Sequence, residues 1–294
     1  MYGLYYLHMR QEGSDLTTFR DPHGGPVAAR HLRDYLLSRG SHTVDVTDVT
    51  TLTGLPERQA TATMTRLRRA GQFFSPTPGL YVAIPPEYAS WGAIPAMDFI
   101  AQLMHKLNRR YYIGLLSAAE LHGAAHQRPQ VFQVMVDKQV TDRDFGRVRL
   151  RFYSRAKLDR FPTVLRNSAT GQVRVATPET TALDLASRPQ DAGGLDNVAT
   201  VLGELVSDQR LTPAGLDTAA PLYHRSVLRR LGWLLDRITD DADTAALALP
   251  LEQLLTERGP RKRPTDLLDP AGRRRGTTSN RWGLIENVEI EPDL

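Results

Sequence analysis

Apolar positions between residues 27 and 84 predict three short helices followed by a β-hairpin. They recur at helical spacing over residues 27–36 and again over 46–52. Gly54-Leu55-Pro56 breaks the second run where only a sharp turn fits, and a third helix is expected over 57–70. This order of elements is typical of a winged helix-turn-helix, whose third helix enters the major groove of DNA.

The third helix has one apolar face and one polar face. Ala60, Met64 and Leu67 share the inner face and are expected to pack against the rest of the domain. We predict that the other face binds DNA through residues near the start and along the outer side of the helix, namely Arg58, Gln59, Ala62, Thr65, Arg66 and Arg69. The first four are the expected base readers, and the last two arginines are expected to meet phosphates.

Two strand-like runs follow this helix, and turn chemistry separates them. Residues 72–75 and 80–84 are rich in apolar and aromatic side chains, and Pro76-Thr77-Pro78-Gly79 lies between them. A proline-glycine turn between two such runs predicts a hairpin. We expect this hairpin to be the wing.

Beyond residue 90 the pattern predicts a mixture of helices and strands. A linker is expected at 91–95 and a helix from about 96 to 108. Ser117 followed by Glu120 is a capping-box pattern, so Ser117 is expected to open a short helix. Residues 177–179, Thr-Pro-Glu, have the cap, first-turn proline and acidic residue that begin another helix.

Three segments read as strands of one sheet, at 131–136, 148–153 and 173–175. A helix is expected over 226–238, where leucines recur along one side. Residues 282–290 have strand propensity and are expected to return to that sheet.

Length and composition suit two domains with their own cores, because the chain has 294 residues and 41% of them are hydrophobic. We predict an α+β protein with an N-terminal extension at 1–25, a winged helix-turn-helix domain at 26–90 and a larger mixed α/β domain at 96–294. The chain has no cysteine, which excludes disulfides, thiolate metal sites and cysteine nucleophiles. No apolar run approaches membrane-spanning length, so we expect a cytoplasmic protein that does not bind membranes.

Arginine gives the chain its basic balance, with a formal net charge of +4 and a pI near 9.4. One cluster lies on the third helix, the predicted DNA-recognition helix at 57–70. The other lies at 258–281, where prolines and glycines predict a loop. Its candidate contact residues are Arg261, Lys262, Arg263, Arg273, Arg274 and Arg275. Such a loop either binds an anionic partner or is simply a solvated surface.

Motifs that would indicate catalysis or a cofactor are absent from the sequence. It has no phosphate-binding glycine loop and no nucleophile elbow. His122 and His126 have a metal-compatible spacing, but Gly123 interrupts the segment and a third ligand is not evident, so His122 is expected to be a packing or hydrogen-bonding residue. We therefore predict a protein that is not an enzyme and has no cofactor or metal.

Several short motifs follow one another in a fairly specific order along the chain. They are Leu67-Arg68-Arg69-Ala70-Gly71, Pro78-Gly79-Leu80-Tyr81, Leu116-Ser117-Ala118-Ala119, Leu121-His122-Gly123, Thr177-Pro178-Glu179-Thr180-Thr181-Ala182-Leu183-Asp184-Leu185 and Leu231-Gly232-Trp233-Leu234-Leu235. In this order they resemble the AbiEi-type abortive-infection antitoxins of toxin-antitoxin pairs. The resemblance implies a winged-helix domain that represses its own operon, joined to a larger domain that counters a nucleotidyltransferase toxin in phage defence. The implied partners are operator DNA, as an inverted repeat upstream of the gene, and the cognate toxin, met directly or through its target.

Two other functions fit the sequence. The first alternative is a winged-helix transcription regulator whose larger domain senses a small ligand. The second is a nucleic-acid enzyme that the winged helix tethers to DNA. A nucleotidyltransferase gene next to this one would favour the antitoxin, and carboxylates converging in a pocket of the larger domain would favour the enzyme.

Overall fold

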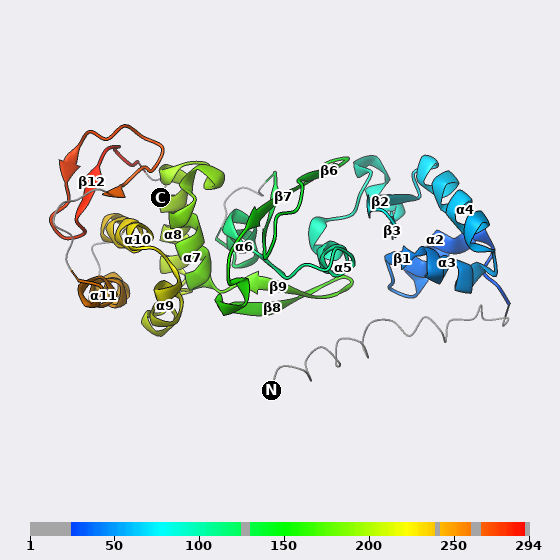
Figure 1. Ribbon diagram of the computed structural model, residues 1–294, viewed down its shortest axis with the longest axis horizontal. Helices are drawn as coiled ribbons and strands as arrows, with labels where there is room; N and C mark the ends of the chain where they lie inside the picture. Colours follow the sequence, from blue (N-terminus) through cyan, green and yellow to red (C-terminus); the bar gives the residue numbers. More distant parts are fainter. Residues whose placement is uncertain (1–24, 125–129, 239–241, 260–265, 292–294) are drawn as a thin grey trace. The chain divides into compact units, whose positions relative to one another are not determined.

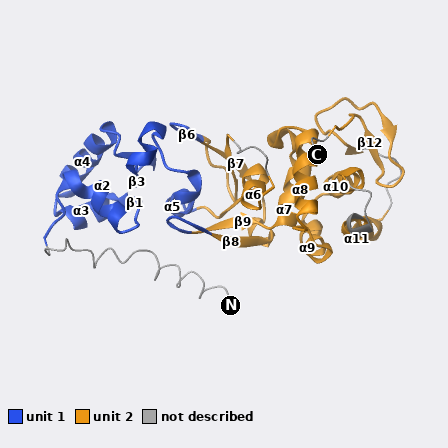
Figure 2. Ribbon diagram, turned by 180° about the vertical axis from the view of Figure 1, so that it is seen from behind, with its two compact units in different colours: residues 1–108, 143–148, 167–171 blue, residues 109–142, 149–166, 172–294 orange. Residues whose placement is uncertain are grey.

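The computed structural model describes residues 25–124, 130–238, 242–259 and 266–291 (Figure 1). The chain forms two compact units, shown in different colours in Figure 2. The first comprises residues 1–108, 143–148 and 167–171, and the second comprises 109–142, 149–166 and 172–294. The predicted extension at 1–25, apart from Gly25, lies outside the described residues.

The first unit opens with three helices and a small antiparallel sheet. Its elements are a 3-10 turn at Ala29–His31, α2 at Leu32–Ser38, β1 at Thr43–Asp45, α3 at Val46–Thr53, α4 at Glu57–Arg69, β2 at Phe73–Thr77 and β3 at Leu80–Ala83. The strand order is β1-β3-β2, with β3 antiparallel to both neighbours. The expected first helix therefore begins as a 3-10 turn, and β1 is an additional strand too short to give a sequence pattern.

Local chemistry fixes the turn between α3 and α4. Asp45 and Asp48 form a reciprocal capping box at the start of α3. Gly54 ends that helix with φ 69°, a left-handed conformation that costs a glycine little. Pro56 then stands in extended conformation as the N-cap of α4. The turn between the two helices thus follows from the residues that predicted it.

The first unit continues past the expected linker. It includes a 3-10 helix at Pro86–Trp91, another at Ala96–Asp98, and α5 at Ile100–Lys106. Ala93 and Ile94 are buried, so residues 91–95 pack as part of the unit and are not a solvated linker. The helix expected over 96–108 is α-helical only at α5.

A six-stranded mixed sheet carries the central part of the chain. Its strands are β4 at Tyr111–Ile113, β5 at Phe132–Val136, β6 at Arg143–Phe145, β7 at Val148–Ser154, β8 at Thr163–Ser168 and β9 at Gly171–Ala176. The order is β6-β7-β5-β4-β9-β8, in which β5 is parallel to β7 and antiparallel to β4. Three of these strands were predicted, and β4, β6 and β8 were not.

Helices make up most of the second unit after the sheet. They are α6 at Leu115–Leu121, α7 at Pro178–Ser187, α8 at Leu195–Ser207, α9 at Pro213–Ala219, α10 at Arg225–Ile238 and α11 at Ala242–Glu257. α10 packs against α7, α8 and α11 (Figure 1). The α+β class predicted from the sequence is confirmed.

The local sequence motif predicted the start of α7 correctly and the start of α6 wrongly. Thr177 caps α7 as predicted, since its hydroxyl accepts from the Thr180 amide at 3.2 Å. The Ser117 prediction is wrong, because α6 begins at Leu115 and Ser117 lies inside it. The Ser117 hydroxyl instead accepts from the Gln133 amide of β5 at 2.9 Å. The hydroxyl therefore bonds to a strand residue distant in sequence and does not cap the helix.

The C-terminal segment forms its own three-stranded sheet, which corrects the expectation that it returns to the large one. The order is β10-β12-β11, with β10 at Asp266–Leu267, β11 at Thr277–Thr278 and β12 at Leu284–Glu286. The Trp282 ring lies against Gly232 of α10, where an added Cβ would meet it at 2.2 Å. This glycine therefore makes room for the ring.

A buried arginine ties this segment to the helices. The Arg230 guanidinium donates to the carbonyl oxygens of Leu268 and Ala186 at 2.6 Å each, and to that of Leu267 at 3.0 Å. Burial lowers the pKa of Arg230 to about 10, which leaves it charged at neutral pH. One side chain of α10 thus joins the end of α7 to the C-terminal segment.

A buried ion pair joins the sheet to the helices of the second unit. Asp184 of α7 is fully buried, and its Oδ1 lies 2.6 Å from a guanidinium nitrogen of Arg155, just after β7. The Tyr223 hydroxyl donates to Oδ1 at 2.7 Å and the Tyr112 hydroxyl to Oδ2 at 3.1 Å. Burial acts to lower the pKa of Arg155, but Asp184 together with Tyr223 and Tyr112 outweighs it and raises that pKa. Burial raises the pKa of Asp184 against the opposing effect of Arg155 and the two hydroxyls. We treat the pair as ionised, because the carboxylate accepts from the guanidinium and from both hydroxyls.

Replacing Asp184 with Ala is expected to lower the free energy of unfolding by about 3–5 kcal/mol, because it leaves a buried guanidinium without its counter-charge. Urea unfolding followed by circular dichroism measures this. Asp208→Ala is the control, since Asp208 and Arg210 are about half exposed at 3.9 Å and their pair should contribute under about 1 kcal/mol. Equal losses in the two variants would contradict the role given to the buried pair.

Candidate functional site

The six residues predicted to contact DNA all lie exposed on α4. Ala60, Met64 and Leu67 are buried on the opposite side, as the pattern predicted. The exposed set is Arg58, Gln59, Ala62, Thr65, Arg66 and Arg69, and Arg68 is exposed beside them. α4 therefore presents four arginines to solvent against the single carboxylate of Glu57.

The second basic cluster is only partly a loop. Arg261, Lys262 and Arg263 lie outside the described residues. Arg258 and Arg281 make contacts within the protein. Arg258 donates to the Tyr223 carbonyl at 2.9 Å, and Arg281 pairs with Asp236 and Glu252 at 2.6 Å each. The hydrogen bond to Glu252 and the charge of Asp236 raise the pKa of Arg281, despite slight burial.

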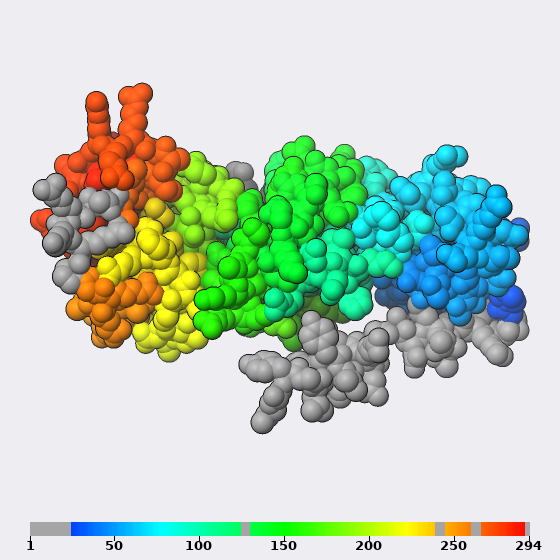
Figure 3. Space-filling model, in the orientation of Figure 1, coloured from blue at the N-terminus to red at the C-terminus, as the bar shows by residue number. Residues whose placement is uncertain are grey.

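Arg273, Arg274 and Arg275 remain as the exposed part of that cluster. Two hydrogen bonds from one side chain hold their turn. The Asn287 amide donates to the carbonyl oxygens of Arg273 at 3.2 Å and Asp269 at 3.0 Å. Figure 3 shows long side chains of this region, coloured orange-red, standing out from the surface. The described part of the cluster is therefore an ordered turn that displays arginines.

His122 has the structural role that the sequence favoured. Its side chain is buried, and Nε2 donates to the Ala176 carbonyl at 2.7 Å. His126 lies outside the described residues. Among the residues that the structure describes, no group of three or more His, Asp or Glu side chains is placed to hold a metal ion.

Glu179, the acidic residue of the Thr-Pro-Glu motif, is also engaged inside the fold. It is buried, and its Oε1 accepts from the amide and the hydroxyl of Thr212 at 3.1 and 2.9 Å. Thr212 is the N-cap of α9, so Glu179 joins the starts of α7 and α9. A catalytic role would require a carboxylate that reaches solvent or substrate.

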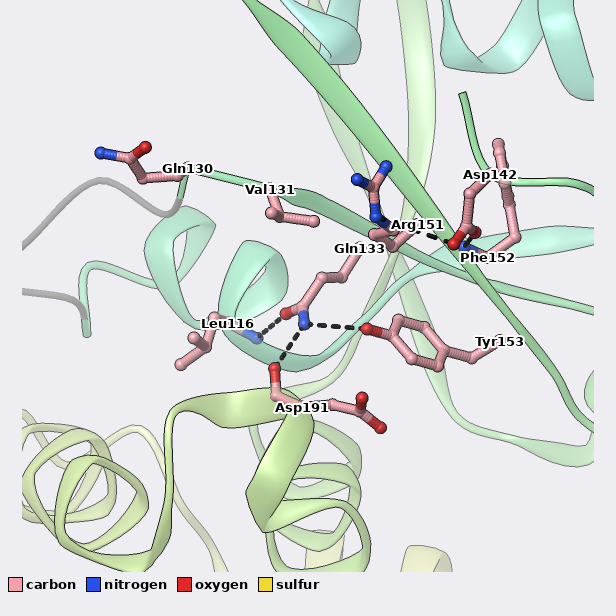
Figure 4. A pocket seen from close by; sticks show the side chains of 9 residues that line it. All are labelled: Leu116, Gln130, Val131, Gln133, Asp142, Arg151, Phe152, Tyr153 and Asp191. Atoms are coloured by element: carbon pink, nitrogen blue, oxygen red, sulfur yellow. Dashed lines mark hydrogen bonds and ion pairs between the residues drawn. The ribbon is translucent and has the colours of Figure 1, made fainter. Parts of the chain in front are cut away.

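A pocket of about 480 Å³ opens between the sheet, α6 and the 3-10 helix at Pro189–Ala192. Figure 4 shows the Gln133 amide among the lining side chains, where it accepts from the Leu116 amide at 2.9 Å and donates to the Asp191 carbonyl at 2.7 Å. The other lining side chains come from Gln130, Val131, Asp142, Arg151, Phe152 and Tyr153. Sequence reasoning missed this site because its residues are scattered along the chain.

The two carboxylates of the pocket already have partners. Asp142 accepts from the Phe152 amide at 3.0 Å and lies 3.7 Å from Arg151, and the Asp191 side chain pairs with Arg188 at 3.2 Å. Burial raises the pKa of Tyr153, which keeps its phenol protonated at neutral pH. The pocket therefore offers hydrogen-bonding and charged groups for binding and does not bring two unpaired carboxylates together.

The pocket, His122 and Glu179 lie in a segment that comparison with known families identifies. Residues 112–237 match the AbiEi antitoxin C-terminal domain. The resemblance seen in the sequence is confirmed over these residues, whereas its segments at 67–71 and 78–81 lie outside the match. Residues 112–237, called the AbiEi segment below, contain the buried Asp184–Arg155 pair, Glu179 and the pocket. The segment ends before the C-terminal sheet and begins after α4.

A solved structure shares the fold across most of the chain. The crystal structure of the RV2827C protein from Mycobacterium tuberculosis aligns with a TM-score of 0.63 and 19% sequence identity. The alignment covers 87% of this chain and 90% of that one. No curated protein matches the sequence. In the described part of the chain, no helix has the length and apolar character needed to span a membrane.

His122 makes the stability of the AbiEi segment depend on pH. Burial lowers its pKa below the ordinary value of 6.5, despite the hydrogen bond to Ala176. The unfolded chain therefore binds this proton more readily, and stability falls as the pH drops below about 6.5. Urea midpoints of the wild type and of His122→Gln at pH 7.5 and 5.5 test this. The variant should lose less stability on acidification, and an equal loss would contradict the role of His122.

Proposed function

We propose that this protein is an antitoxin that represses its own operon and neutralises a nucleotidyltransferase toxin as part of phage defence. The observation that carries the proposal is the AbiEi match over residues 112–237. The exposed arginine face of α4 supports the repressor half. A nucleotidyltransferase gene beside this one, with loss of toxicity on co-expression, would support the antitoxin half.

The proposed DNA interface is the outer face of α4. The helix begins after a sharp turn, exposes four arginines and packs its apolar residues inward, which suits insertion into a major groove. Arg58, Gln59, Ala62 and Thr65 would face bases, and Arg66 and Arg69 would meet phosphates. Binding to an inverted repeat would combine two such helices, because one module alone gives low affinity.

The antitoxin activity is assigned to the second unit, which contains most of the AbiEi segment. Its internal charged groups, including Asp184, Arg155 and Glu179, are engaged in holding the fold, and we propose no catalytic role for them. A ligand-responsive regulator remains the second candidate, and the pocket around Gln133 favours it. A metabolic gene neighbourhood and a small molecule that changes DNA affinity would support that reading.

Replacing Arg58 and Arg69 together with Ala is expected to weaken operator binding by about 1–3 kcal/mol per arginine and to lower the salt dependence of binding. Gel shifts over a series of salt concentrations measure both effects. Protection against the toxin should persist, because these residues lie outside the AbiEi segment.

Arg149→Ala with Arg166→Ala is the matched control, since both arginines are exposed and the same charge is removed from the second unit. This control should leave operator affinity within about twofold of the wild type. Unchanged affinity in the Arg58 and Arg69 variant would remove α4 from the interface.

The exposed turn at Arg273–Arg275 has two candidate anionic partners. Changing all three to Gln should weaken operator and random DNA by a similar factor if the turn contacts phosphate. It should abolish protection with repression intact if the turn acts on the toxin, directly or through its target. We expect the second result, because the turn belongs to the second unit and α4 has its own arginines. Wild-type behaviour in all three assays would identify a solvated surface.

A further inference from the structure

The hairpin that follows α4 is buried almost along its whole length. From Phe73 to Ile84 only Ser75, Pro78 and Gly79 have more than a small exposed fraction. Phe73 is 2% exposed and Val82 is fully buried. A DNA-contacting wing requires its strands and tip to be accessible from outside, and this hairpin offers little beyond its two-residue turn.

Other parts of the first unit cover the hairpin. The Phe74 ring packs against Phe99 at 5.1 Å between centroids and against Phe145 at 5.4 Å. The guanidinium of Arg143 donates to the Pro76 carbonyl. At the tip, a Cβ added to Gly79 would lie 3.5 Å from the Lys106 side chain. The outer surface of the hairpin is thus an internal packing surface of this unit.

The hairpin also lacks the chemistry for holding phosphate or reading a groove. Residues 72–84 contain no lysine or arginine. Its exposed tip residue, Pro78, has no amide hydrogen to donate. Of the neighbouring cations, Arg143 donates to the Pro76 carbonyl, and Lys106 is exposed and lies 3.7 Å from Asp45.

We propose that the hairpin is a packing element and not a DNA-contacting wing, so that base recognition is confined to α4 in the major groove. The inference rests on the proposed DNA binding and adds which surface performs it. It also assigns a specificity: a minor-groove group beside the α4 site should not influence affinity.

Base analogues separate the two grooves. Replacing guanine by inosine removes the minor-groove amino group and leaves the major-groove edge, whereas 7-deazaguanine removes a major-groove acceptor. The probe is a duplex spanning the inverted repeat upstream of the gene, bound by the full chain. Inosine substitutions should change Kd by less than twofold, and 7-deazaguanine should weaken binding at least tenfold at one or more guanines.

A pair of substitutions tests the protein side. Pro78→Glu and Ala62→Glu each add one carboxylate at an exposed position, the first on the hairpin tip and the second on α4. Pro78→Glu should leave Kd within twofold of the wild type, and Ala62→Glu should raise it more than tenfold. Equal Tm values for the two variants and the wild type establish that each still folds.

The results separate this inference from the function on which it rests. A loss for Pro78→Glu comparable to that for Ala62→Glu, or strong interference by inosine, would overturn the hairpin assignment while DNA binding stands. Failure of the wild-type chain to bind the duplex would overturn both. Weak effects of 7-deazaguanine and of Ala62→Glu in a chain that does bind would place recognition on another surface and overturn the inference.

Discussion

Asp184 and Arg155 form the contact on which the second unit depends, because the pair joins the helices to the sheet in the buried interior. The two charges would be costly to bury alone, and Tyr112 and Tyr223 add hydroxyl donors to the carboxylate. The Arg155 guanidinium also lies over the Phe161 ring at 4.4 Å and the Tyr223 ring at 5.0 Å. Charge, hydrogen bonds and ring contacts therefore fix one arrangement of α7 against the end of β7.

Ion pairs and hydrogen bonds also join the C-terminal segment to α10. Arg229 pairs with Asp266 at 2.8 Å, and Arg230 binds carbonyl oxygens on both sides of the helix. The indole nitrogen of Trp282 donates to Asp236 at 2.6 Å, and its ring occupies the space that Gly232 leaves open. α10 is therefore held in place by contacts with α7 and with the C-terminal segment, whose residues are distant from it in sequence.

Local signals in the sequence predicted the elements that local chemistry fixes. Gly54 and Pro56 gave the turn before α4, and Thr177 gave the start of α7, because a cap or a turn needs only residues nearby. Ser117 failed as a cap since Gln133, far along the chain, uses its hydroxyl. Short strands such as β4 and β6 were not predicted, because three residues give no periodicity. The strand propensity around β12 was predicted, but its sheet was not, because its place depends on distant partners.

The candidate sites divide in the same way. The exposed face of α4 could be predicted, because helical spacing alone separates Met64 from the arginines, whereas the pocket around Gln133 needs five separate parts of the chain. The structure was also needed to tell which arginines are accessible, because the sequence does not show which of them are buried or paired. Arg155, Arg229 and Arg281 are paired with carboxylates and Arg230 binds carbonyl oxygens inside the fold, so the number of arginines in the sequence overstates how many are available to a polyanion. The exposed arginines of α4 and of the 273–275 turn are therefore more informative than the net charge, because only accessible cations can release counterions from a nucleic acid or meet an acidic partner.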